Sequence, residues 1–130
     1  MTGTATVYAL SQTPEGIVPG ANPAQPAFLE GSACYVNAAF FDQTGNPLTP
    51  AALSYRIDDL LSGEQILDWT TITPEATVQV LVTGEQNEMV SFSRPAETHQ
   101  ILFSITDPAG NEPFYARALF DLIRIPGVQD

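Results

Sequence analysis

The residues from His99 to Ile125 carry a strong β-hairpin signature, which constrains the fold more than any other stretch. Two strand-like runs, HQILFSI and FYARALFDLIRI, flank the turn sequence TDPAGNEP. Apolar runs on both sides of a turn rich in Gly, Pro, Asn and Asp are typical of two antiparallel strands. Because a lone hairpin is only marginally stable in water, the rest of the chain must supply strands that cover it.

Shorter strands are predicted upstream of the hairpin. Residues 34–40, 52–57 and 77–83 place apolar side chains at alternate positions, residues 65–72 form a further strand-like run, and turn residues separate these segments. This period of two indicates strands with one buried face, and no helical period of useful length competes with it. With 130 residues the chain most simply forms one domain. We therefore expect an all-β fold, an antiparallel β-sandwich of about seven strands over residues 28–130.

Residues 1–27 contain four of the eleven prolines, which excludes a helix and favours an extended, Pro-rich N-terminal arm. Thr4–Leu10 is β-prone and could form a short strand. The segment is either a loosely packed leader or an arm that adds a strand to the sheet edge of a neighbouring subunit. We favour the arm, because five of its side chains are more apolar than a spacer needs: Val7, Tyr8, Leu10, Ile17 and Val18.

The second strand of the hairpin is apolar on both faces. Alternate residues from Phe114 to Leu122 form one predicted core face, and the opposite face carries Leu119, Ile123 and Ile125. The outer face of a sandwich strand is ordinarily polar, so the excess predicts that a partner or the arm covers this end. We therefore add these three residues to the five of the arm as candidates for a partner interface.

The charge balance excludes some partners. Fifteen acidic residues against four Arg give a net charge of −11. Such a chain repels phosphate and anionic lipid, so we expect binding to neither nucleic acid nor membrane. The N-terminus has no basic region followed by an apolar core, so we expect no signal peptide and synthesis in a cytosol.

No residue pattern predicts chemistry. His99 and Cys34 are single, and no metal-ligand spacing is present. We expect His99 to face solvent or a neighbouring strand, and Cys34 to be buried. Asp58 and Asp59 would point to opposite faces of a strand and end it. The prediction is therefore a chain that is not an enzyme, with no catalytic residue, cofactor or metal.

Three further features have ordinary structural interpretations. The segments 42–46 and 107–111 cluster oxygen donors, but they lack the spacing of a calcium loop and are read as Asx turns. Trp69 is single and lies within a predicted strand, where a core position is more common than an exposed platform for sugars.

From Phe41 onward the order of features resembles a small immunoglobulin-like domain of tailed-bacteriophage virion proteins. The matching stretches are FDQTGNPLTPAALSYRIDDLLSGEQILDWTTI, TVQVLVTGEQNEM, SRPAETHQILFSITDPAGN and FYARALFDLIRI. The resemblance covers about two-thirds of the chain. It implies an immunoglobulin-like sandwich without catalysis, carried on capsids or tails, and it transfers no functional residue.

These observations together predict a virion structural protein assembled in the host cytoplasm. The first hypothesis is a capsid decoration (cement) protein, a homo-oligomer that stabilises the shell through contacts with the major capsid protein. A head–tail connector or tail component is the alternative within that class. A host- or carbohydrate-binding adhesin module is the alternative from another class.

Overall fold

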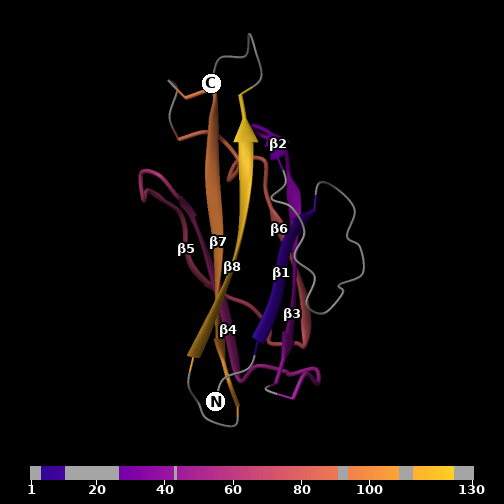
Figure 1. Ribbon diagram of the computed structural model, residues 1–130. Helices are drawn as coiled ribbons and strands as arrows, with labels where there is room; N and C mark the ends of the chain where they lie inside the picture. Colours follow the sequence, from indigo (N-terminus) through magenta and orange to yellow (C-terminus); the bar gives the residue numbers. More distant parts are fainter. Residues whose placement is uncertain (1–3, 11–26, 43, 91–93, 109–112, 125–130) are drawn as a thin grey trace.

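The computed structural model describes residues 4–10, 27–42, 44–90, 94–108 and 113–124, and within these ranges the chain is all-β (Figure 1). No helix in the described part of the chain is long and apolar enough to cross a membrane. The strands are β1 (Thr4–Leu10), β2 (Ala27–Leu29), β3 (Cys34–Phe41), β4 (Ala52–Asp59), β5 (Gln65–Thr71), β6 (Thr77–Val82), β7 (Ala96–Thr106) and β8 (Pro113–Ile123).

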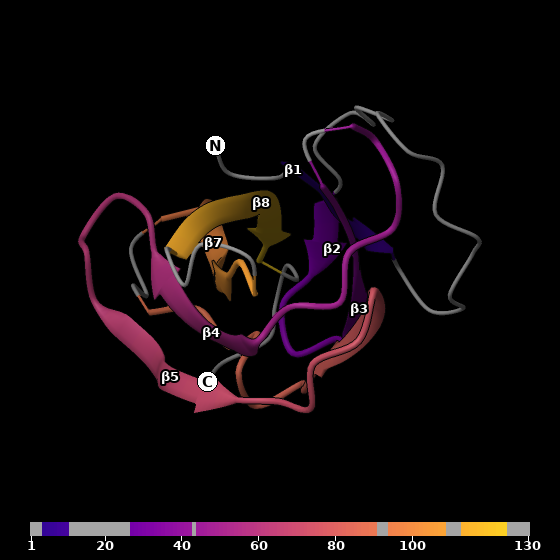
Figure 2. The same ribbon diagram turned by 90° about the horizontal axis from the view of Figure 1, so that it is seen from below.

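The strands form two sheets that face each other as a sandwich, seen from one end in Figure 2. The smaller sheet has the order β1-β3-β6, and the larger has the order β2-β8-β7-β4-β5. The predicted hairpin is β7 with β8, paired antiparallel from Ala96 opposite Ile123 to Thr106 opposite Pro113. The all-β, two-sheet fold and the strands β3 to β8 confirm the sequence prediction, whereas β2 was not predicted and pairs parallel rather than antiparallel.

The core lies between the inner faces of the two sheets. Along β7, buried and half-buried residues alternate without interruption, and β4 does the same over most of its length. The largest fully buried apolar side chains are Phe40, Leu53, Ile57, Ile101, Phe103, Ile105, Phe120 and Leu122. Burial of such a side chain contributes about 1.5–3 kcal/mol, so the alternating residues fix which face of each strand is inside.

Residues 4–10 belong to the smaller sheet, although we expected residues 1–27 to form an arm outside the sandwich. β1 pairs antiparallel with β3, from Thr4 opposite Phe41 to Leu10 opposite Tyr35. It also runs close to β8 of the other sheet (Figure 1). The physical reason is that β3 has backbone groups to satisfy on both edges, and a β-prone segment of the same chain is the nearest source of a partner.

β2 extends the larger sheet at its β8 edge. It pairs parallel with the end of β8, with Phe28 opposite Leu122 and Leu29 opposite Ile123. Phe28 is buried and its ring lies 5.9 Å from that of Phe120, whereas Leu29 points outward and is exposed. This end of the sandwich, where β2 and β8 finish and β7 begins, also holds the polar groups described next.

Candidate functional site

A tight turn between β4 and β5 places Asp59 at the end of the core. Asp59 is the last residue of β4, and its Oδ2 accepts hydrogen bonds from the amide and hydroxyl of Ser62. Gly63 has φ 75°, a conformation that glycine adopts without strain, and its amide donates to the carbonyl of Asp59. The turn thus explains why a fully buried aspartate ends a strand here.

Glu97 and His99 reach the same place from β7. They are two residues apart, so both point inward, on the face that continues as Ile101 and Phe103. Residue His99 is directly opposite Asp59 in the β4–β7 register. His99 Nε2 lies 3.0 Å from Glu97 Oε1 and 3.7 Å from Asp59 Oδ1, and all three side chains are buried. The apolar core therefore ends in an ionisable cluster.

Arg94 closes this cluster from the segment before β7. Its Nη2 lies 3.0 Å from Asp59 Oδ2 and 3.3 Å from Glu97 Oε2, and its side chain is 23% exposed. Burial alone would raise the pKa of Asp59, but hydrogen bonds from Ser62 and Arg94 outweigh burial and hold that pKa below its ordinary value. Asp59 is therefore a carboxylate at neutral pH. We call Asp59, Arg94, Glu97 and His99 the ion cluster.

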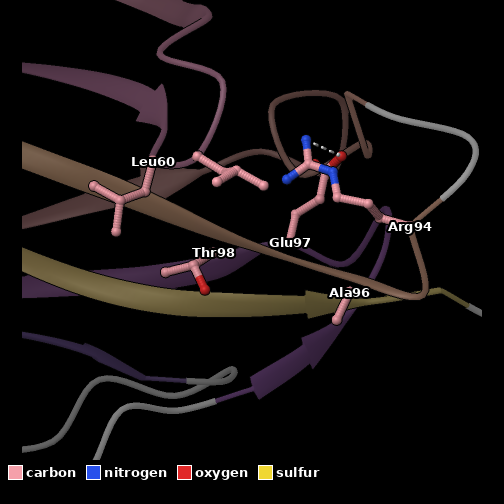
Figure 3. Close-up of a pocket in the computed structure, with 6 residues that line it drawn as sticks. Leu60, Arg94, Ala96, Glu97 and Thr98 are labelled. Carbon is pink, nitrogen blue, oxygen red and sulfur yellow. Dashed lines mark ion pairs between the residues drawn. The ribbon is translucent and has the colours of Figure 1, made fainter.

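Beside the ion cluster lies an open hollow of about 430 Å³ (Figure 3). Its lining combines Arg94 and Glu97 with Leu60, Leu61, Ala96 and Thr98. The figure shows the guanidinium of Arg94 against the carboxylate of Glu97, with Leu60 on the other side of the hollow. Solvent in the hollow therefore reaches Arg94 on the outer side of the ion cluster, whereas Asp59 and His99 are buried on its inner side.

Exposed apolar side chains gather around the same end. Leu29 (53% exposed) and Ile123 (42%) are paired across β2 and β8, and Ala96 of β7 is opposite Ile123. Leu60 (43%) and Leu61 (77%) extend this surface across the hollow. We call these five residues the apolar end patch. Such a group on the outside of a sheet is typical of a surface that contacts another molecule.

The structure brings only some of the predicted interface residues to this end. Ile123 lies in the apolar end patch, and Leu119 of β8 is half-buried. Ile17, Val18 and Ile125 lie outside the described residues. Val7, Tyr8 and Leu10 fall on β1, whose backbone pairs with β3 of the same chain. Their contact with a neighbouring subunit stays a prediction.

The ion cluster was not predicted from the sequence. Of the two positions expected for His99, the solvent-facing one is wrong because the side chain is fully buried, and the cross-strand one is confirmed because His99 lies opposite Asp59 of β4. Its contact with Glu97 was not expected. The pair Asp58 and Asp59 does point to opposite faces, as expected, with Asp58 bound to Arg56 at 2.7 Å. The available signal was Glu97 and His99 on the inward phase of β7, where the pattern otherwise places apolar residues.

The expected core position of Trp69 is wrong. Its side chain is 42% exposed on β5, which is an edge strand of the larger sheet. The guanidinium carbon of Arg56 lies 5.6 Å from the centre of its ring, a cation–π contact. An edge strand buries its side chains less than a central strand does. Trp69 therefore remains accessible to solvent although it lies in the middle of β5.

The Asx turn predicted at Asp42 is present. Asp42 Oδ1 accepts hydrogen bonds from the amides of Thr44 and Asn46 and from the hydroxyl of Thr44. The hydrogen bond from Thr44 is the largest reason why the pKa of Asp42 is lowered. The Asp42 carboxylate therefore stabilises the turn that contains it. The second segment, 107–111, extends beyond the described residues.

Cys34 is buried, as predicted, and Asn87 lies against it. The side-chain amide of Asn87 donates to the carbonyl of Ser32 at 2.7 Å and contacts Cys34 Sγ at 3.5 Å. Burial raises the pKa of the Cys34 thiol, and the contact with Asn87 offsets only part of that rise. The thiol is therefore held in its protonated, unreactive form at neutral pH.

Comparison with known proteins gives no relative for this chain. No family model matches it, and neither do the curated proteins or the solved structures that were searched.

Proposed function

We propose that this chain is a structural protein of a tailed-phage particle, an immunoglobulin-like capsid decoration protein that stabilises the shell by contacts between subunits. The observation that carries the proposal is the apolar end patch, which adjoins the end of β8, where the apolar outer face of the strand predicts a partner. The two-sheet sandwich and the resemblance of residues from Phe41 onward support the same conclusion.

The charges support a position outside the shell. With a net charge of −11, the chain would repel packaged DNA, and an acidic surface is compatible with exposure to solvent. The five side chains of the apolar end patch would then face a neighbouring subunit, and removal of their area from water would supply the free energy of binding. The major capsid protein is the proposed partner, and a homo-oligomer on the shell is the proposed assembly.

The test compares two charge-introducing variants on phage heads that lack the protein. Leu61→Glu combined with Ile123→Glu places charges in the apolar end patch and is expected to reduce occupancy of the heads at least tenfold. Leu81→Glu is the matched control, because Leu81 is 48% exposed on β6 of the other sheet. Equal occupancy by both variants would contradict this interface, and no binding of wild type to heads would contradict the decoration role.

Copy number separates the alternatives within the same class. A decoration protein is expected at many copies over the shell, and heads without it should burst at a lower temperature. A connector or tail component would instead be found at a few copies at one vertex or on the tail. Quantitative mass spectrometry of purified particles measures this directly.

The exposed Trp69 favours one second candidate, a carbohydrate-binding adhesin module. Aromatic rings at a surface can stack on sugars, and Trp69 is accessible beside Arg56. In that case the isolated chain should bind host cells or glycans, and Trp69→Ala should abolish the binding. Binding that survives Trp69→Ala, or no binding by the wild type, would reject this candidate.

A further inference from the structure

We propose that Asp59, Glu97 and His99 form a binding site for a divalent metal ion, with zinc as the ion that fits best. The site is independent of the proposed function and lies in the end of the core rather than on the apolar surface. Its three potential ligand atoms, one from each side chain, all lie within 4.8 Å of one another. All three residues are buried, which separates them from ordinary exposed acidic groups.

The spacing of the ligand atoms suits a tetrahedral ion. In a tetrahedral site, zinc bonds of about 2.0–2.2 Å place neighbouring ligand atoms about 3.3–3.6 Å apart. His99 Nε2 lies 3.0 Å from Glu97 Oε1 and 3.7 Å from Asp59 Oδ1, on either side of that value. Because all three ligand atoms lie within 4.8 Å of one another, side-chain adjustment would bring the imidazole nitrogen and the carboxylate oxygens to bonding distance of one ion without a change in the backbone register of β4 and β7.

An unsatisfied atom points into the same space. Asp59 Oδ1 has no hydrogen-bond partner among the described residues, although it belongs to a fully buried side chain. His99 Nε2 lies 3.7 Å from this oxygen, which is longer than a hydrogen bond. A buried carboxylate oxygen without a donor is costly, and a metal ion between Asp59 and His99 would satisfy it.

The other carboxylate oxygens are already held in place. Asp59 Oδ2 binds Arg94 and Ser62, and Glu97 Oε2 binds Arg94. The amide of Val90 donates to Glu97 Oε1 at 2.8 Å. Metal-binding carboxylates are commonly oriented by such outer partners. Arg94 therefore acts here as a positioning residue, and it leaves the two carboxylate oxygens nearest His99 directed toward the imidazole.

The charge of the ion cluster also leaves room for a cation. Two buried acidic side chains, Asp59 and Glu97, face one guanidinium, that of Arg94. A divalent metal ion would add positive charge beside the two acidic groups. Three protein ligands leave a fourth zinc position, which a water molecule ordinarily fills.

The experiment uses the full chain, produced without a histidine tag, stripped with EDTA and titrated with zinc. We expect one zinc per chain and a rise in Tm of about 10 °C at a hundredfold excess over Kd. Because His99 is the only histidine, the imidazole nitrogen resonances of the wild-type protein report directly on it. Zinc should shift them. Absence of zinc binding, or binding without this shift, would overturn the site.

Variants give a second readout. His99→Gln and Asp59→Asn are expected to weaken zinc binding at least a hundredfold. Cys34→Ser removes the only thiol, and Asp68→Asn removes an exposed carboxylate of β5, so both should bind zinc as the wild type does. Loss of binding in Cys34→Ser instead would place the ion elsewhere. If a ligand variant fails to fold, the zinc-induced shift of the His99 imidazole resonances in the wild-type protein is the test of the site.

Discussion

Arg94 and Asp59 are separated by 35 positions in the sequence, yet Arg94 Nη2 lies 3.0 Å from Asp59 Oδ2 at the sealed end of the core. Arg94 also reaches Glu97, so one guanidinium contacts two buried carboxyl groups. The ion pair connects the segment before β7 to the last residue of β4. The ion cluster therefore stabilises the contact between these two segments, in addition to being a candidate site.

Arg94→Met should destabilise the fold by about 2–4 kcal/mol. Removal of one partner from a buried ion pair leaves an uncompensated charge, and the partial exposure of Arg94 moderates the cost. Urea unfolding followed by tryptophan fluorescence measures the change. Arg117→Met is the matched control, because Arg117 is exposed and binds only to the Gln100 side chain in the described contacts. A loss in the control as large as in Arg94→Met would contradict the proposed role of the cluster.

Gly84→Ala should destabilise the protein through a backbone clash. A Cβ at this position would meet the carbonyl oxygen of Gly31, which is main chain and cannot rotate away. The loops around Gly31 and Asn87 would have to separate, although the Gly31 amide donates to the Asn87 carbonyl at 2.9 Å. We expect a cost of about 2–3 kcal/mol in urea unfolding.

Gly63→Ala is the comparison for that substitution. Gly63 has open space for a Cβ but a positive φ of 75°, so its cost is conformational, about 1–2 kcal/mol. A smaller loss of unfolding free energy for Gly84→Ala than for Gly63→Ala would contradict the predicted clash, because it would show that the loops around Gly31 and Asn87 separate at little cost.

Stability should fall in acid partly because of Asp59. Its pKa is lowered in the folded protein, whereas an unfolded aspartate titrates near pH 3.9. The folded state therefore binds fewer protons, and the contribution of Asp59 is present above about pH 4 and disappears as the pH falls through the folded pKa.

The urea midpoint of the wild type, measured in EDTA from pH 6 to pH 2.5, should decline more steeply at the acid end than that of Asp59→Asn. Asp68→Asn, at an exposed position, should follow the wild type. Parallel curves for the wild type and Asp59→Asn would contradict this contribution.

The Cys34 thiol should react with a disulfide reagent at pH 8 only after opening of the fold. Burial raises its pKa, and Asn87 lies against the sulfur. We expect a rate at least about a hundredfold below that of the same thiol in denaturing urea. Equal rates in the two conditions would show that the loop bearing Asn87 does not protect it.

The sequence predicts the strands well because each one repeats a simple alternation. The inward residues of β7 from Ile101 to Ile105, and those of β8 from Ala118 to Leu122, follow directly from the period of two. The smaller sheet was harder: a short strand at Thr4–Leu10 was considered, but the local pattern does not show that its partner is β3 of the same chain rather than a neighbouring subunit.

The ion cluster could not be predicted in the same way. Glu97 and His99 share a face by local periodicity, but their meeting with Asp59 depends on the register of β4 against β7, which no local pattern encodes. The prediction that Trp69 is buried was wrong for a related reason. Its exposure follows from the edge position of β5, and the order of strands in a sheet is a property of the whole fold.

The order of the larger sheet has a consequence for biosynthesis. β7 and β8 come last in the chain among the described strands, yet they occupy inner positions, with β2 on one side and β4 on the other. The inner edge of β4 has no final hydrogen-bonding partner until β7 has left the ribosome, and β2 has none until Ile123 has left it. The larger sheet can therefore be completed only after translation of the hairpin, and β2 stays unpaired on the nascent chain until then.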